Sequence, residues 1–121
     1  MARVMIVDDS PTDVQNLKNI LLKAGHSVVE STSGQEALER VKVEKPEVVI
    51  MDVVMPGVNG FQATRSLSKD PVTAHIPVIV VSSKNQETDR VWALRQGARE
   101  YLVKPVKEAD LLGKIKAVLG G

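Results

Sequence analysis

The sequence predicts an α/β fold in which a five-stranded parallel sheet carries helices on both faces. Five short apolar runs recur along the chain, and a segment with apolar residues at helical spacing follows each of them. The runs are continuously apolar, which is typical of strands that are buried on both faces in a parallel sheet. Strands that alternate with helices are joined by right-handed crossovers, so we expect a doubly wound arrangement of five strand–helix units.

The expected strands are about five residues long and rich in β-branched side chains, and the second is more polar than the others. They are RVMIV (3–7), HSVVE (26–30), EVVIM (47–51), PVIVV (77–81) and YLV (101–103). Runs of this length suit strands better than helices, which usually extend over ten residues or more.

The first two expected helices have clear start and stop signals. Ser10 is a predicted N-cap, Pro11 takes the first helical position, and Gly25 ends the helix. Ser33 and Glu36 have the spacing of a capping box at the start of the second helix.

The three later helices are predicted from the same kinds of signal. Asn59 caps a helix that holds Phe61 and Leu67, the fourth helix runs over 85–97, and the last one starts near residue 108. The residues expected to face inward are Val91, Leu94 and Ala98 around the fourth helix, and Leu111, Leu112, Ile115, Val118 and Leu119 in the last.

Composition limits the class of protein. The 121 residues are 43% hydrophobic, so we expect one folded domain over residues 1–121. A net charge of +1 gives no support to nucleic-acid or membrane-surface binding, and the absence of cysteine excludes disulfides and thiolate metal sites. Neither a bilayer-spanning apolar run nor a signal peptide is evident, so we expect a cytoplasmic protein without membrane insertion.

Polar side chains stand where four of the expected strands end. Asp8 and Asp9 follow the first strand, Asp52 the third, Ser82 the fourth and Lys104 the fifth. Taken singly, an acid after a strand is usually a turn former, a serine a cap, and a lysine a solvated surface group. Because parallel strands end at one edge of the sheet, where α/β proteins place their sites, the joint occurrence favours a functional cluster.

The residue types indicate phosphoryl chemistry supported by a hard cation. Three neighbouring carboxylates repel one another unless a cation joins them, and oxygen ligands on short side chains suit Mg²⁺. Asp52 could then act as a nucleophile and form an aspartyl phosphate. Mg²⁺, Lys104 and the hydroxyl of Ser82 would share the negative charge of the transferred oxygens.

Four segments carry a family resemblance over essentially the whole chain. IVDDS (6–10), DVVMPGVNG (52–60), VVSS (80–83) and YLVKP (101–105) resemble, in order and spacing, the signature segments of the receiver domain of two-component response regulators. This is the CheY-like family, whose fold is flavodoxin-like. The resemblance implies a signalling domain that accepts a phosphoryl group from a partner histidine kinase, and not an enzyme beyond self-phosphorylation and self-dephosphorylation.

The resemblance also implies roles for the acidic residues. Asp52 matches the phosphoacceptor of the family. Asp9 and Asp52, together with the backbone carbonyl of Val54, match the ligands of Mg²⁺. Asp8 matches a residue that helps to hold the ion, either directly or through a water molecule.

Further positions match the family's switching machinery. Ser82 matches the hydroxyl that senses the phosphoryl group, and Lys104 matches the family's lysine, with a cis peptide bond to Pro105. Tyr101 matches the switch aromatic, which moves between outward and inward rotamers. Gly60 matches the glycine that closes the loop after the phosphoacceptor.

Two longer stretches, 59–70 and 86–106, are similar to stand-alone receivers of type IV pilus (twitching-motility) chemosensory systems. This implies a single-domain response regulator in pilus-based motility or chemotaxis-type signalling. Val54 and Lys84 stand two residues after Asp52 and Ser82, at places that set phosphoryl lifetime in the family, and both differ from the polar-acidic pair of the flagellar chemotaxis protein.

A surface around Trp92, Arg95 and Tyr101 is the expected binding face for an effector protein. Trp92 has two interpretations, since it can pack on a neighbouring helix or lie on the partner surface. Two other functions stay open. A Mg²⁺-dependent phosphohydrolase would need a second acid where Val54 stands, and a receiver that docks without phosphorylation would not need the intact set of Asp8, Asp9, Asp52, Ser82 and Lys104.

Overall fold

All five strands of the computed structural model are parallel and lie in the order β2-β1-β3-β4-β5. The structure describes residues 1–55 and 57–120, so Pro56 of the loop motif and Gly121, the last residue of the expected domain, lie outside the described residues. The elements are β1 (Arg3–Val7), α1 (Pro11–Lys23), β2 (Ser27–Ser31), α2 (Gly34–Glu44), β3 (Val48–Met51), α3 (Gly60–Lys69), β4 (Val78–Ser82), α4 (Glu87–Arg95), β5 (Glu100–Val103) and α5 (Glu108–Val118).

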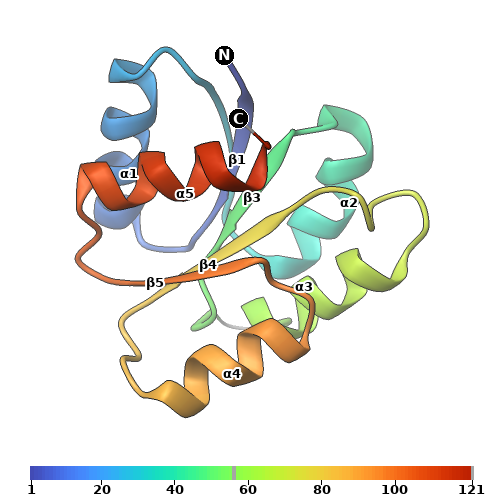
Figure 1. Ribbon diagram of the computed structural model, residues 1–121. Coiled ribbons are helices and arrows are strands. Elements are labelled where there is room, and N and C mark those ends of the chain that lie inside the picture. Colours follow the sequence, from blue (N-terminus) through green and yellow to red (C-terminus); the bar gives the residue numbers. More distant parts are fainter. Residues whose placement is uncertain (56, 121) are drawn as a thin grey trace.

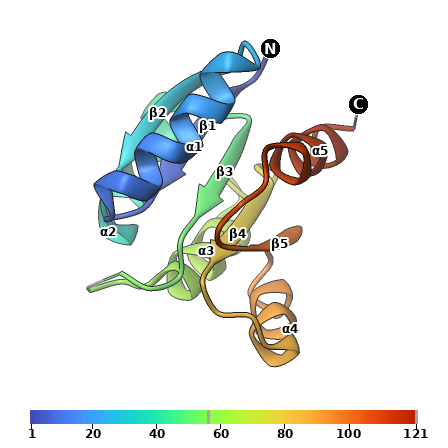
Figure 2. The same cartoon turned by 90° about the vertical axis from the view of Figure 1, so that its left-hand side faces the viewer.

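The helices cover both faces of the sheet, as the sequence predicts. Figure 1 shows α1 and α5 over one face and α2, α3 and α4 over the other, and Figure 2 shows the same layers from the side. Among the described residues, no helix is long and apolar enough to span a membrane.

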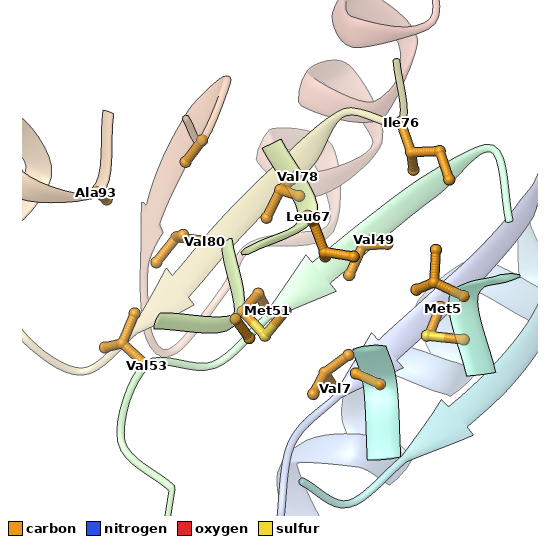
Figure 3. Packing of buried hydrophobic residues seen from close by; sticks show 14 of the residues in the cluster. Met5, Val7, Val49, Met51, Val53, Leu67, Ile76, Val78, Val80 and Ala93 are labelled. Carbon is orange, nitrogen blue, oxygen red and sulfur yellow. The ribbon is translucent and has the colours of Figure 1, made fainter. Parts of the chain in front are cut away.

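A hydrophobic core lies on each face of the sheet, and successive strand residues point alternately into one core and the other. This explains why the strands are apolar without alternation. In β1, Val4 and Ile6 join the cluster under α1 and α5, whereas Met5 and Val7 join the cluster under α2, α3 and α4. All four side chains are fully buried. Figure 3 shows the second cluster, in which Met5 and Val7 lie on β1 next to β3, and the residues of β4 lie beyond β3.

The predicted helix starts are mostly confirmed. The backbone N–H of Asp13 donates to the hydroxyl of Ser10 at 3.4 Å. The N–H of Glu36 donates to the hydroxyl of Ser33 at 3.1 Å. The carboxylate of Glu36, however, accepts from the N–H of Thr32 at 3.2 Å and not from that of Ser33, so the predicted capping box is only half formed. At α3 the box formed by Asn59 and its partner three residues later is complete.

The prediction of the inward face was wrong for parts of the last two helices. Helix α4 spans Glu87–Arg95 and buries Ala93 completely, whereas Leu94 is 37% exposed. Helix α4 is a neighbour of edge strand β5, and its small Ala93 belongs to the buried cluster, whereas the larger Leu94 does not. In α5 the buried residues are Leu111 and Ile115, and the predicted inward residue Leu119 is exposed at the end of the helix.

The strand order reverses between β1 and β3, and this places the functional residues. In α/β sheets, ligands bind outside the carboxyl ends of the strands at such a switch point. Residues Val7 and Met51 are paired across these strands, so Asp8 and Asp52, the next residue on each strand, emerge side by side. The N–H of Asp52 donates to the carbonyl of Val7 at 2.9 Å, which fixes the start of the loop after β3.

Candidate functional site

Three carboxylates meet at the carboxyl edge of the sheet. Asp8, Asp9 and Asp52 each offer an oxygen, and these oxygens all lie within 4.8 Å of one another. Asp8 and Asp52 are buried, with 2% and 6% of their surface exposed, whereas Asp9 is exposed. The cluster predicted from the sequence is therefore present, with two of its members largely shielded from water.

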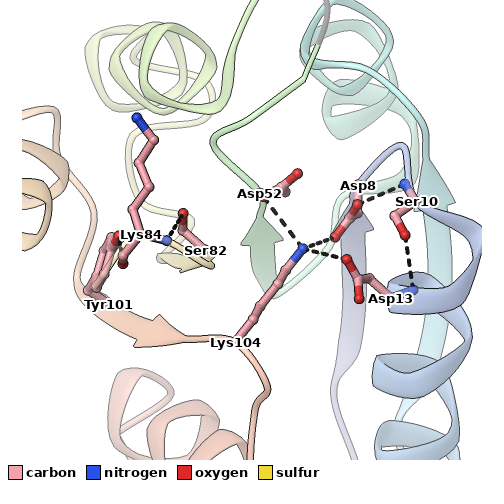
Figure 4. Close-up of polar contacts among 8 residues, drawn as sticks. All are labelled: Asp8, Ser10, Asp13, Asp52, Ser82, Lys84, Tyr101 and Lys104. Carbon is pink, nitrogen blue, oxygen red and sulfur yellow. Dashed lines mark hydrogen bonds and ion pairs between the residues drawn. The ribbon is translucent and has the colours of Figure 1, made fainter. Parts of the chain in front are cut away.

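Lys104 brings the one ammonium group of this cluster from the far edge strand. Its Nζ donates to Asp8 Oδ2 at 2.9 Å and to Asp13 Oδ2 at 2.8 Å (Figure 4). The same nitrogen lies 3.6 Å from Asp52 Oδ1. The side chain is 17% exposed, and the N–H of Lys104 donates to the carbonyl of Ser82 at 2.8 Å, which anchors its backbone to β4.

The charges of the site perturb one another strongly. Burial, followed by the negative charge of Asp8, raises the pKa of Asp52, and the nearby Lys104 offsets this only in part. Burial by itself would lower the pKa of Lys104, but its hydrogen bonds to Asp13 and Asp8 and the charge of Asp52 outweigh burial and raise that pKa. Lys104 therefore stays protonated, and the carboxylates of Asp8, Asp13 and Asp52 share its ammonium.

The donor set fits a small divalent cation. Carboxylate oxygens are the ligands that Mg²⁺ prefers, and Mg²⁺ needs few of them because it retains several waters. The excess of negative charge around buried Asp8 and Asp52 would be relieved by such an ion. Asp8, Asp9 and Asp52 are the residues placed to hold it, and coordination by the carbonyl of Val54 stays a prediction.

A chain of contacts joins the predicted sensing hydroxyl to the predicted switch aromatic. Ser82 is fully buried at the end of β4, and its Oγ accepts from the N–H of Lys84 at 3.1 Å. The carbonyl of Lys84 in turn accepts from the hydroxyl of Tyr101 at 2.7 Å. One residue, Lys84, thus binds both side chains, as Figure 4 shows.

Gly60 is required where α3 begins against the end of β3. A Cβ at Gly60 would lie 2.0 Å from the carbonyl oxygen of Asp52 and 2.6 Å from the Cα of Val53. No side chain can occupy this space, so a glycine at this position lets α3 start directly against the backbone of Asp52.

The two candidate partner-surface residues lie on α4, away from the acidic cluster. Trp92 is 50% exposed, and Arg95 is also exposed. Trp92 lines a groove with Phe61 and Arg65 of α3. Trp92 is thus half exposed beside α3, and its role in a partner surface stays a prediction.

One residue of the site was missed in the sequence. Asp13 binds Lys104 from α1, although 91 residues separate the two. Asp13 stands in the first turn of a capped helix, where an acid is ordinary, so its position suggests only a helix-dipole role. The one available signal was that this helix starts directly after Asp8 and Asp9.

The fold and the acidic cluster are those expected of a receiver-type signalling domain, and comparison with known proteins agrees. Residues 4–116 match the model of the response regulator receiver domain, and the chain belongs to this family. It is 57% identical to protein PilH of Pseudomonas aeruginosa over 121 residues, which is 100% of both chains.

Two further proteins are similar to this chain, one in sequence and one in structure. The chain is 36% identical to chemotaxis protein CheY of Thermotoga maritima over 117 residues, covering 96% of each chain. The crystal structure of Vibrio cholerae chemotaxis protein CheY4 superposes with a TM-score of 0.90 at 29% identity and covers 98% of each chain. The predicted fold class and the predicted family are therefore confirmed.

Proposed function

We propose that this chain is a stand-alone response regulator in which Asp52 accepts a phosphoryl group and thereby switches a protein-binding face. The observation that carries the proposal is the placement of Asp52, which is 6% exposed and lies with Asp8 and Asp9 in one oxygen cluster beside the ammonium of Lys104. Phosphoryl transfer needs mainly positioning and charge neutralisation, and this cluster supplies both.

The covalent step is a displacement at phosphorus. An oxygen of Asp52 forms the new P–O bond, and the bond from phosphorus to the donor breaks. The leaving group keeps the electron pair, and when the donor is the phosphohistidine of a partner kinase, the released imidazole takes a proton from solvent. Lys104 stays protonated and can donate to an oxygen of the transferred group.

Asp8, Asp9 and Asp52 would hold Mg²⁺, which when bound neutralises charge on the transferred oxygens. The chain's own residues do the rest. The buried setting of Asp52 limits access of water, and Lys104 spans from β5 to β1 and ties the fifth strand to the site.

The signal would leave the site through Lys84. A phosphoryl group brings roughly −1.5 to −2 charge and three acceptor oxygens. If the hydroxyl of Ser82 turns toward it, the N–H of Lys84 loses its acceptor, and the same residue holds the hydroxyl of Tyr101. Movement of Tyr101 would then alter the surface beside Trp92 on α4.

The setting proposed is pilus-based motility or chemotaxis-type signalling, on the strength of the full-length similarity to PilH. A histidine kinase would be the phosphodonor, as expected for the receiver family. The phosphohydrolase alternative is not favoured, because Val54 stands where an acid would have to protonate the leaving group. A cytoplasmic location and a single domain over residues 1–121 belong to the same proposal.

Intact-protein mass spectrometry tests the proposal. The parent chain is mixed with acetyl phosphate in Mg²⁺ or in chelator, and the mass of one added phosphoryl group is followed. We expect uptake by the parent in Mg²⁺, strongly reduced uptake in chelator or with Asp9→Asn, and none with Asp52→Asn. Equal uptake by Asp52→Asn and the parent would refute the assignment.

A further inference from the structure

We propose that Asp13 is a positioning residue that holds the Lys104 ammonium off Asp52 and releases it when Asp52 becomes phosphorylated. The inference rests on the proposed function and adds a regulatory contact from α1. Three acids surround Lys104 Nζ, and its shortest contact is the 2.8 Å hydrogen bond to Asp13. The contact to Asp8 is 2.9 Å and that to Asp52 is 3.6 Å.

The Lys104 ammonium forms an ion pair with Asp52 but no direct hydrogen bond. An ammonium has three N–H donors. Two of them are used at hydrogen-bond distance by Asp8 and Asp13, and the distance to Asp52 exceeds the range of a direct hydrogen bond. The third N–H is left for an oxygen of a phosphoryl group on Asp52. A shift of the ammonium toward Asp52 to bring this N–H within range would stretch the bonds to Asp8 and Asp13.

Asp13 is the acceptor that can be given up. Its side chain is 41% exposed, so water can solvate its carboxylate once Lys104 has left. Asp8 has a side-chain exposure of 2%, and an unpaired charge there would be far less tolerable. Release of Lys104 should therefore break the bond to Asp13 first.

Asp13 is also held in place for this role. It stands in the first turn of α1, where its N–H donates to the hydroxyl of Ser10. The N–H of Ser10 donates to Asp8 Oδ1 at 2.9 Å. Asp8 and Asp13, the two acceptors of Lys104, are thus linked through the cap of α1, and the start of this helix is part of the site (Figure 4).

Removal of the competing negative charge should favour phosphorylation. Asp13→Asn should raise the initial rate of phosphoryl uptake from acetyl phosphate in saturating Mg²⁺ by roughly two- to fivefold, the range given by a partly exposed ion pair. Asp13→Glu keeps a carboxylate acceptor and should restore a rate near that of the parent. Each variant's unfolding midpoint is measured so that a folding defect is recognised.

The matched control is Asp110→Asn. Asp110 occupies the third position of α5, as Asp13 does in α1, so the substitution removes the same charge from the same place in a helix. Among the described residues, the acids that contact Lys104 are Asp8, Asp13 and Asp52. Asp110→Asn should therefore leave the rate of uptake unchanged.

A second readout needs no phosphoryl group. Hydrogen exchange of the Lys104 ammonium, followed by nitrogen NMR, should be faster in Asp13→Asn than in the parent and in Asp110→Asn. The proposal is overturned if exchange is unchanged in Asp13→Asn, if that variant takes up phosphoryl no faster than the parent, or if Asp110→Asn is accelerated equally. If the parent itself takes up no phosphoryl group, the proposed function fails, whereas the exchange measurement still tests the contact.

Discussion

The Lys104 ammonium lies 3.6 Å from Asp52 Oδ1, within ion-pair range but beyond a direct hydrogen bond. This separation leaves the carboxylate of Asp52 without a strong bond to the cation that faces it. The Asp52 oxygen that faces Lys104 is thus not occupied by a direct hydrogen bond from this ammonium, which is already close enough to meet the negative charge that the reaction would bring.

Lys104→Met should destabilise the fold by about 3 kcal/mol in metal-free buffer, because it leaves the buried carboxylate of Asp8 without its cation. Urea denaturation measures the loss. The matched control is Lys114→Met, which breaks the surface pair with Glu100 at 3.1 Å and should cost at most about 1 kcal/mol. If both variants lose the same free energy of unfolding, the buried ion pair of Lys104 contributes no more to stability than the surface pair of Lys114.

Asp52→Asn should stabilise the metal-free protein at neutral pH by about 1–3 kcal/mol, the usual scale for a buried polar group without full compensation. Burial and the charge of Asp8 raise the pKa of Asp52, so the folded state holds this proton more tightly than the unfolded chain does. The parent should therefore lose stability as pH rises from the ordinary value of 3.8 through the raised pKa.

The gain of Asp52→Asn should accordingly be small in acid and full above the raised pKa. Urea denaturation in chelator at a series of pH values checks the sign. If the gain in unfolding free energy shrinks as pH rises, the charged form of Asp52 is not the one that burial and Asp8 destabilise.

Gly60→Ala should cost about 3 kcal/mol or more, since its Cβ would lie 2.0 Å from the carbonyl oxygen of Asp52 and the backbone would have to move. Gly113→Ala is the control, because a Cβ there meets no atom within 4 Å. In the interior of α5 it should instead stabilise the protein by roughly 0.5–1 kcal/mol. Thermal unfolding should show a lower midpoint for Gly60→Ala and a higher one for Gly113→Ala. An unchanged midpoint in Gly60→Ala would refute the close contact between residue 60 and the backbone of Asp52.

Ser82→Ala should weaken the fluorescence response of Trp92, the one tryptophan of the chain, to acetyl phosphate and Mg²⁺. The substitution removes the hydroxyl that binds Lys84, which also binds Tyr101. Ser83→Ala, at the exposed neighbouring residue, should respond as the parent does. The relay through the hydroxyl is wrong if Ser82→Ala and the parent give the same response.

The size of that response should be limited in the absence of a partner. Moving a two-state equilibrium from 1:99 to 99:1 takes about 5.5 kcal/mol. A hydrogen bond to a charged group contributes about 1.5–3 kcal/mol, so Lys104 and Ser82 together barely reach this value. We therefore expect an incomplete change in the phosphorylated protein alone.

The layered fold could be predicted because its signals are local. Each strand is a short run that must be apolar on both sides, and residues such as Val4 and Met5 do face opposite cores. Because parallel strands end at one edge, the same pattern also predicts that Asp8, Asp52 and Lys104 lie together. The site was thus largely predictable from topology.

What escaped prediction depends on contacts between distant segments. Leu94 fits a helical stripe in the sequence, but the small Ala93 is the residue of α4 that joins the buried cluster, and Leu94 is exposed. Asp13 looks like an ordinary acid in a first helical turn, and only the fold brings it 2.8 Å from Lys104. The exposure of Leu94 and the contact between Asp13 and Lys104 cannot be predicted from the local spacing of residues.

The most direct test of the account is to locate the acyl phosphate. The parent chain is phosphorylated with acetyl phosphate and Mg²⁺, reduced with borohydride, digested and sequenced by mass spectrometry, so that the phosphorylated carboxylate is recorded as homoserine. We expect this mark at residue 52 and at no other acid, and none in Asp52→Asn. A mark at Asp8, Asp9 or Asp13, or the same mark in protein never exposed to the phosphodonor, would contradict the account.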